Sequence, residues 1–233
     1  MKGFFITGTD TDVGKTLISS GLAAIFKEKN MDIGVYKPLL SGASRYHPNS
    51  DTSLLKEMAQ TKLSNASITP FQFKEPLAPY VAAKLEGRSI YLEDVVAHWK
   101  KIQKKHDYFI VEGAGGISVP LGEDFLVSHL IQELQLPIII VARSDLGTFN
   151  HTFLTVQYAK EMKLNIAGII INGIDDPPNL AEKTNPNLIE SFCKVPILGI
   201  LPKMQVVDAQ DFKQIIKDNI DTASLIHQMQ QNG

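Results

Sequence analysis

The sequence has little cysteine and little net charge. Cys193 is its single cysteine, which excludes an internal disulfide and is typical of a protein from a reducing compartment. The 23 basic and 25 acidic residues give a formal net charge of −2, so the sequence lacks the broad basic surface that binds a nucleic-acid backbone. We therefore predict a cytoplasmic protein with a buried, structural Cys193 and no nucleic-acid partner.

Long hydrophobic runs are also missing. No segment approaches the ~18 consecutive apolar residues of a membrane-spanning helix, and the apolar run near the N-terminus is too short for a signal peptide. We therefore predict no membrane partner. The 233 residues, 44% hydrophobic and 21% charged, contain no internal repeat and are typical of a globular protein. Length and composition together predict one domain over residues 1–233.

Short β-branched apolar runs alternate along the chain with segments of helical spacing. The apolar runs lack period-two alternation, as strands buried on both faces do, and occupy residues 4–6, 33–36, 108–111, 138–141, 166–171 and 197–201. Helical spacing occupies residues 17–26, 92–102, 126–134, 153–162 and 188–192. This order predicts a three-layer α/β/α fold with a central, mostly parallel sheet and a ligand at the carboxyl ends of its strands.

Two segments are less regular. Residues 39–79 are rich in Ser, Asn, Pro and Thr, with one helix expected to start near Asp51, and long insertions of this kind often form lids or binding loops. The polar tail after Met204 is expected to close with a helix from Asp208 to Met229.

A glycine-containing turn follows the first predicted strand and reads GTDTDVGKT over residues 8–16. In the phosphate-binding pattern GxxxxGK[ST], backbone N–H groups close on the phosphates, Lys reaches the β and γ oxygens, and Ser or Thr binds Mg²⁺. Gly14, Lys15 and Thr16 match this pattern, whereas Thr9 occupies the place of the first glycine. The context of buried strand, turn and helix favours a phosphate-binding loop (P-loop) over a plain turn.

Two acidic residues, Asp10 and Asp12, lie within this loop. A carboxylate beside a triphosphate is unfavourable unless a metal, a cationic substrate or a proton transfer involves it. These residues therefore suggest an amine substrate.

An acidic residue also ends the strand predicted at residues 108–111. Glu112 is followed by Gly113, Ala114, Gly115 and Gly116. An acid at this place in P-loop enzymes lies across from the loop's Thr and completes the Mg²⁺ site. We predict that the glycine run is a flexible turn whose N–H groups approach an anion, with a plain turn as the alternative.

Lys37 follows the second predicted strand, at the same sheet edge as the P-loop. There it would neutralise the charge that develops during phosphoryl transfer, and a solvated surface lysine is the alternative. Asp51, in the sequence NSD, suits either a helix N-cap or a further acidic metal ligand.

Taken together, these motifs resemble those of the dethiobiotin synthetase family. The matching segments are GTDTDVGKT at 8–16, YKPLLSG at 36–42, NSD at 49–51, VEGAGG at 111–116 and LGTFNH at 146–151, all in family order. Asn172 and the turn at 202–204 extend the match more weakly. The resemblance implies a P-loop enzyme that makes dethiobiotin from 7,8-diaminononanoate, CO₂ and ATP, through a carbamate and a carbamic-phosphoric anhydride.

The resemblance also assigns roles to residues. It implies that Lys15 bridges the β and γ phosphates, that Lys37 binds the carbamate and the migrating phosphoryl group, and that Asp12 lies near the amine, where the family most often has Glu. The implied Mg²⁺ ligands are Thr16, Asp51 and Glu112. The implied ATP contacts are Asp12, Val13, Gly14, Lys15, Thr16, Leu17, Asp51, Glu112, Gly113, Ala114, Gly115, Asn172, Gly173, Pro202, Lys203 and Met204. The implied substrate contacts are Thr11, Lys37, Ser41, Leu146, Gly147 and Asn150.

Members of this family are homodimers in which the segment matching residues 146–150 reaches the partner's substrate carboxylate, so a homodimer is expected. One alternative is a synthetase of the cobyrinic acid diamide type, but such chains continue into a glutamine-hydrolysing domain with a nucleophilic cysteine. A second alternative is a partitioning-type regulatory ATPase, whose loop carries an early second lysine where this chain has Asp10.

Overall fold

A six-stranded sheet forms the centre of the computed structural model, which describes residues 2–204 and 209–231. All of its neighbouring strands are parallel, in the order β2-β5-β1-β6-β7-β8. The strands are β1 (Lys2–Gly8), β2 (Ile33–Tyr36), β5 (Tyr108–Gly116), β6 (Ile138–Arg143), β7 (Ile166–Ile174) and β8 (Ile197–Pro202). Each predicted strand is present, which confirms the predicted α/β fold.

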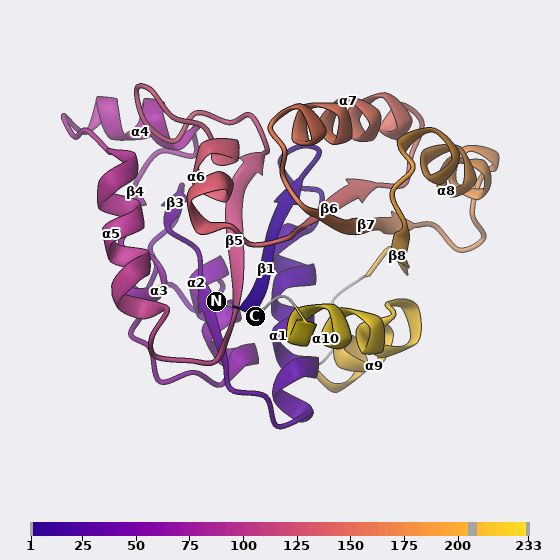
Figure 1. Ribbon diagram of the computed structural model, residues 1–233, viewed down its shortest axis with the longest axis horizontal. Helices are drawn as coiled ribbons and strands as arrows, with labels where there is room; N and C mark the ends of the chain where they lie inside the picture. The colour runs from indigo at the N-terminus through magenta and orange to yellow at the C-terminus, as the bar shows by residue number, and fades with distance from the viewer. Residues whose placement is uncertain (1, 205–208, 232–233) are drawn as a thin grey trace.

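Helices cover both faces of this sheet (Figure 1). One apolar cluster packs the sheet against α4 (Pro79–Leu85), α5 (Leu92–Ile102), α6 (Val127–Leu134), α7 (Thr148–Glu161) and α8 (Leu180–Cys193). The other packs it against α1 (Lys15–Glu28), α2 (Asp51–Ala59), α3 (Asn65–Ile68), α9 (Ala209–Asn219) and α10 (Thr222–Gln231). The molecule therefore has the predicted three layers.

Alternate side chains of each central strand enter different clusters. In β1, Phe5 packs in the cluster with α5 and α6, whereas Phe4 and Ile6 pack in the cluster with α1. All three side chains are fully buried. Burial on both faces explains why these strands are continuously apolar in the sequence.

The irregular stretch at residues 39–79 contains more regular structure than predicted. It holds a small parallel pair, β3 (Leu39–Ser41) with β4 (Phe71–Phe73), besides α2 and α3. The helix expected near Asp51 is α2, and Ser50 caps it by accepting a hydrogen bond from the Ser53 N–H. The N-cap interpretation of Asp51 is therefore wrong, because Asp51 is the first residue inside the helix.

The glycine run after Glu112 is not a turn, and that prediction is wrong. Strand β5 continues through Gly116, which pairs with Gly8 of β1. The ladder with β1 reaches Gly116, whereas the ladder with β2 ends at Val111, so the pairing with β1 keeps this glycine-rich segment extended.

Two helices begin well before their predicted bounds. The helix predicted at 188–192 is the longer α8, which contains Pro186 and begins with a capping box between Asn179 and Glu182. The helix predicted at 153–162 begins five residues earlier, after Gly147 at its N-cap. A capping box marks the start of α8, whereas α7 starts after a left-handed Gly147 without a side-chain cap, and the apolar spacing marked only the later turns of both helices.

The helix predicted from Asp208 to Met229 is instead two helices, α9 and α10, and Asp208 itself lies outside the described residues. Asp221 separates them: its N–H donates to the Leu198 carbonyl, and its carboxylate accepts from the Ser224 N–H. This contact with the strand end interrupts the helix. Cys193 is fully buried as predicted. Among residues 2–204 and 209–231, no helix is both long and apolar enough to cross a membrane.

Trp99 links helix α5 to the strand that leads to Lys37. Its ring stacks on Tyr36 with centroids 5.5 Å apart and meets Phe109 edge-on at 5.1 Å. We predict that Trp99→Ala lowers the free energy of unfolding by about 3–5 kcal/mol, because it leaves a large cavity. Urea denaturation followed by circular dichroism measures this, with the exposed Leu85→Ala as a control that changes stability by less than about 0.5 kcal/mol. A loss below about 1 kcal/mol in Trp99→Ala would show that the core refills the space.

Candidate active site

The P-loop turns from the end of β1 into the start of α1. Gly14 has φ 94° and Asp12 has φ 57°, a left-handed conformation that glycine adopts freely and Asp tolerates. Lys15 is the first residue of α1 and is 7% exposed. Its ammonium donates a hydrogen bond to the Asp10 carbonyl at 2.9 Å, so the loop closes around its own lysine.

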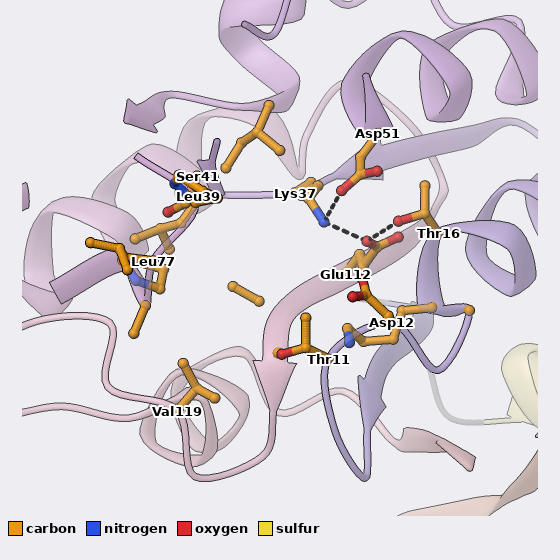
Figure 2. A pocket seen from close by; sticks show the side chains of 18 of the residues that line it. Thr11, Asp12, Thr16, Lys37, Leu39, Ser41, Asp51, Leu77, Glu112 and Val119 are labelled. Carbon is orange, nitrogen blue, oxygen red and sulfur yellow. Dashed lines mark hydrogen bonds and ion pairs between the residues drawn. The ribbon is translucent and has the colours of Figure 1, made fainter. Parts of the chain in front are cut away.

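Lys37 lies between β2 and β3, and its ammonium bridges two carboxylates. The Nζ is 2.7 Å from Asp51 Oδ2 and 2.5 Å from Glu112 Oε1 (Figure 2). Thr16 Oγ1 donates to the same Glu112 oxygen at 2.7 Å. Residues from β5, α1, α2 and the end of β2 therefore meet at one point, as the sequence predicted for the carboxyl edge of the sheet.

Electrostatics bind this cluster together. Burial lowers the pKa of the Lys37 ammonium, but attraction to Glu112 and Asp51 raises it more, so the net pKa lies above its ordinary value. Burial likewise raises the pKa of Asp51, but the charge and hydrogen bond of Lys37 outweigh it, and the net pKa is lowered. Burial is the main cause of a lowered pKa of Lys15, and the charge of Lys37 adds to it. Lys37 is therefore charged and Asp51 ionised at neutral pH.

A cavity of about 670 Å³ opens beside this cluster. One side holds the charged groups, and the other is apolar, with Leu39, Leu77 and Val119 away from Thr16 and Asp51 (Figure 2). Pro76 lies close to the end of β3, where a Cβ on Gly42 would come within 2.7 Å of the Pro76 Cβ. The cavity is therefore shaped for a ligand with one polar and one apolar part.

Most of the predicted site residues line this cavity. They are Thr11, Asp12, Gly14, Lys15, Thr16, Leu17, Lys37, Ser41, Asp51, Glu112, Ala114 and Gly115. The other predicted residues do not line it, and they are Val13, Gly113, Leu146, Gly147, Asn150, Asn172, Gly173, Pro202, Lys203 and Met204.

Asn172, predicted near adenine, lies against the P-loop. Its side-chain amide donates to the Val13 carbonyl at 3.0 Å, and a Cβ on Gly14 would come within 2.2 Å of its Nδ2. Lys203 forms an exposed ion pair with Asp175 at 3.4 Å. Contacts of these residues with a base stay predictions.

The segment at residues 146–150 lies outside the cavity of its own chain. Leu146 is 87% exposed, and a Cβ on Gly147 would meet nothing within 4 Å. The loop before it is nevertheless fixed, since Asn185 of α8 donates to the carbonyls of Ser144 and Asp145.

Sequence reasoning missed two features of the site. The apolar wall of Leu39, Leu77 and Val119 was not predicted from the sequence, although Leu39 and Leu77 belong to the stretch predicted as a binding loop. Arg143 at the end of β6 was also missed: its Nη2 is 2.6 Å from Asp10 Oδ2. Asp10 thus has a cationic partner within the chain, so only Asp12 still argues for a cationic substrate.

A glycine loop that joins the first strand of a parallel sheet to a helix, with a buried lysine and a hydroxyl at its end, defines a P-loop nucleoside triphosphate-binding protein. A family model described as an AAA domain matches residues 2–211. Two solved structures share the fold alone: MinD from Aquifex aeolicus (TM-score 0.56, 15% identity, 99% of this chain and 96% of that one) and a ParA family ATPase from Chlorobium tepidum TLS (TM-score 0.54, 17% identity, 96% and 92%).

Curated relatives are much more similar in sequence. The ATP-dependent dethiobiotin synthetases BioD of Bacillus subtilis subsp. natto and Bacillus subtilis (strain 168) are 65% and 64% identical, each over 98% of this chain and 99% of the relative. That of Bacillus thuringiensis (strain Al Hakam) is 45% identical over 87% of this chain and 84% of the relative. The chain belongs to the ATP-dependent dethiobiotin synthetase family.

The ion pair of Asp51 with Lys37 predicts a pH dependence of stability. Because the pKa of Asp51 is lower in the folded than in the unfolded protein, the ion pair stabilises the fold fully above about pH 4 and less as the pH falls through the folded-state pKa. We therefore predict that Asp51→Asn is less stable than the parent protein at neutral pH, and that this difference shrinks below about pH 4. Urea unfolding at a series of pH values measures it, and a difference independent of pH would contradict the prediction.

Proposed function

We propose that the protein makes dethiobiotin from 7,8-diaminononanoate, CO₂ and ATP. CO₂ adds to one amine to give a carbamate, the carbamate oxygen attacks the γ-phosphorus of ATP and releases ADP, and the second amine attacks the carbonyl carbon, expels phosphate and closes the cyclic urea. The convergence of Lys15, Lys37, Thr16 and two carboxylates on one cavity carries the proposal. The family names of the relatives support it.

Mg²⁺ is proposed to bind at Thr16, Asp51 and Glu112. The donor set is one hydroxyl and two carboxylates, the oxygen ligands that Mg²⁺ prefers. Glu112 Oε2 is buried without a hydrogen-bond partner among the described residues, so it has a free acceptor for a cation. When bound, the ion would neutralise charge on the β and γ phosphates.

The two halves of the cavity suit the two halves of the proposed diamine. Leu39, Leu77 and Val119 would contact the hydrocarbon chain, which gains free energy by leaving water. Ser41 Oγ is buried without a hydrogen-bond partner among the described residues, and it lines the same cavity. An amine or carbamate donor would satisfy this orphan oxygen, because an unpaired buried hydroxyl is unfavourable.

Lys15 and Lys37 are proposed to share the charge of the transferring phosphoryl group. The Lys15 ammonium has three N–H donors, of which the Asp10 carbonyl takes one, so two are left for phosphate oxygens. Lys37 is proposed to bind the carbamate and the migrating group, and its fixed charge would stabilise the transition state without reorganisation. Asp12 is proposed to orient the amine or to accept its proton.

A homodimer is proposed with residues 146–150 serving the partner's site. The exposure of Leu146, together with Leu154 and Phe192 on α7 and α8, supports it, because these apolar side chains lie outside the core. The single domain over residues 1–233 and the cytoplasmic location stay predictions. The fold is shared with partitioning ATPases, but the relatives identical at 45% or more bear synthetase names, and no observation favours the two alternative functions.

Product formation tests the proposed reaction. We expect the protein, incubated with diaminononanoate, radiocarbon-labelled bicarbonate and Mg-ATP, to form acid-stable label in the amount of ADP released, because the cyclic urea survives acid whereas a free carbamate does not. ATP hydrolysis that needs neither diamine nor bicarbonate, without such label, would instead fit a regulatory ATPase.

Substitution of the two lysines is predicted to have different effects on ATP binding and turnover. Lys37→Gln is expected to abolish turnover and leave ATP binding largely intact, since its charge matters most in the transition state. Lys15→Ala is expected to lose both ATP affinity and rate, because its phosphate partners are present in the ground state too. Calorimetry with ATP and the labelling assay measure the two effects. Near-parental turnover of Lys37→Gln, or unchanged ATP affinity of Lys15→Ala, would refute the respective role.

A further inference from the structure

Asp10 connects two residues of the P-loop to the end of β6, although it does not line the cavity. Its carbonyl accepts from the Lys15 ammonium at 2.9 Å, and its Oδ1 accepts from the Thr11 N–H at 2.7 Å. Its Oδ2 accepts from Arg143 Nη2 at 2.6 Å. The position of Asp10 therefore affects both Lys15 and Thr11, which do line the cavity.

The backbone of Arg143 is held by contacts on both sides. It ends strand β6, which pairs with β1 and β7 inside the sheet. Its own carbonyl accepts from Thr148 Oγ1 at 2.6 Å, at the start of α7. The backbone of Arg143 is therefore fixed on both sides, so its guanidinium has a fixed anchor from which to hold Asp10.

The opposite side of the loop is held as well. Asn172 at β7 donates to the Val13 carbonyl, and the backbone on either side of Val13 is left-handed, at Asp12 and at Gly14. A loop with this strained conformation stays in one arrangement only if its surroundings fix it. Without the Arg143 contact, one of the three side-chain contacts that join the loop to strands of the sheet is lost.

We propose that Arg143 is a positioning residue for nucleotide binding: its ion pair with Asp10 holds the P-loop in the conformation that presents Lys15 to the phosphates. Arg143 acts through Asp10 and does not touch the nucleotide. A loop that spends part of its time in other conformations binds ATP more weakly, because its apparent dissociation constant is the intrinsic one divided by the fraction in the competent conformation. The pair is partly exposed, so its loss shifts the equilibrium by about two- to fivefold.

A double-mutant cycle tests this inference. We expect Arg143→Ala and Asp10→Asn each to raise the dissociation constant of a non-hydrolysable Mg-ATP analogue about two- to fivefold by calorimetry. The double variant is expected to be no weaker than either single variant, because both remove the same contact. Arg143→Lys is expected to restore part of the affinity. The turnover number at saturating ATP should change less than twofold, since excess nucleotide selects the competent loop.

The chain offers a matched control. Lys217 pairs with Glu28 at 2.6 Å, with side chains 39% and 37% exposed, against 38% and 49% for Arg143 and Asp10. Lys217→Ala, on α9 away from the cavity, is expected to leave analogue affinity unchanged. A fall in the melting temperature of Arg143→Ala with unchanged affinity for the analogue would show that the ion pair only stabilises the fold, and this would overturn the inference.

Two further outcomes would also overturn it. Additive losses in the double variant would mean that Arg143 does not act through Asp10, and a loss of turnover at saturation with unchanged affinity would place Arg143 on the reacting groups. If Arg143→Ala does not fold, Arg143→Lys and Asp10→Asn carry the same test. The measurement needs only nucleotide binding, so its result is independent of whether dethiobiotin is the product.

Discussion

The site depends on the ion cluster of Lys37 with Asp51 and Glu112. Glu112 is 1% exposed and Lys37 5%, and a buried charge without a partner is strongly unfavourable. The buried charges of Lys37 and Glu112 are therefore stable only because each has an oppositely charged partner. This requirement fixes the end of β2 and the start of α2 against β5, and it places the Thr16 hydroxyl of α1 on the same carboxylate.

The sheet makes this cluster possible by bringing strand ends to one edge. The parallel order puts β1 between β5 and β6, so the P-loop is flanked by Glu112 on one side and Arg143 on the other. Apolar packing on both faces keeps the strands in register and leaves only their ends for polar chemistry. The loop is thus held by neighbours on three strands, β5, β6 and β7.

The cavity has a charged side and an apolar side. On the charged side, Lys37 and Glu112 come from strand ends and Asp51 from the insertion after β2, and the same insertion supplies Leu39 and Leu77 of the apolar side. Such a division suits a substrate that carries amines at one end and a hydrocarbon chain at the other.

The sequence by itself determined the sheet strands, the P-loop, and the lysine and acids at the strand ends, because burial on both faces and phosphate binding each require particular residue types in order along the chain. Only the tertiary structure decided that Asp51 pairs with Lys37 and not with a helix terminus, that the run after Glu112 is a strand, and that Asp10 binds Arg143. These outcomes depend on contacts between residues more than a dozen positions apart, and local propensity carries no information about which distant partner a charge or a backbone group will find.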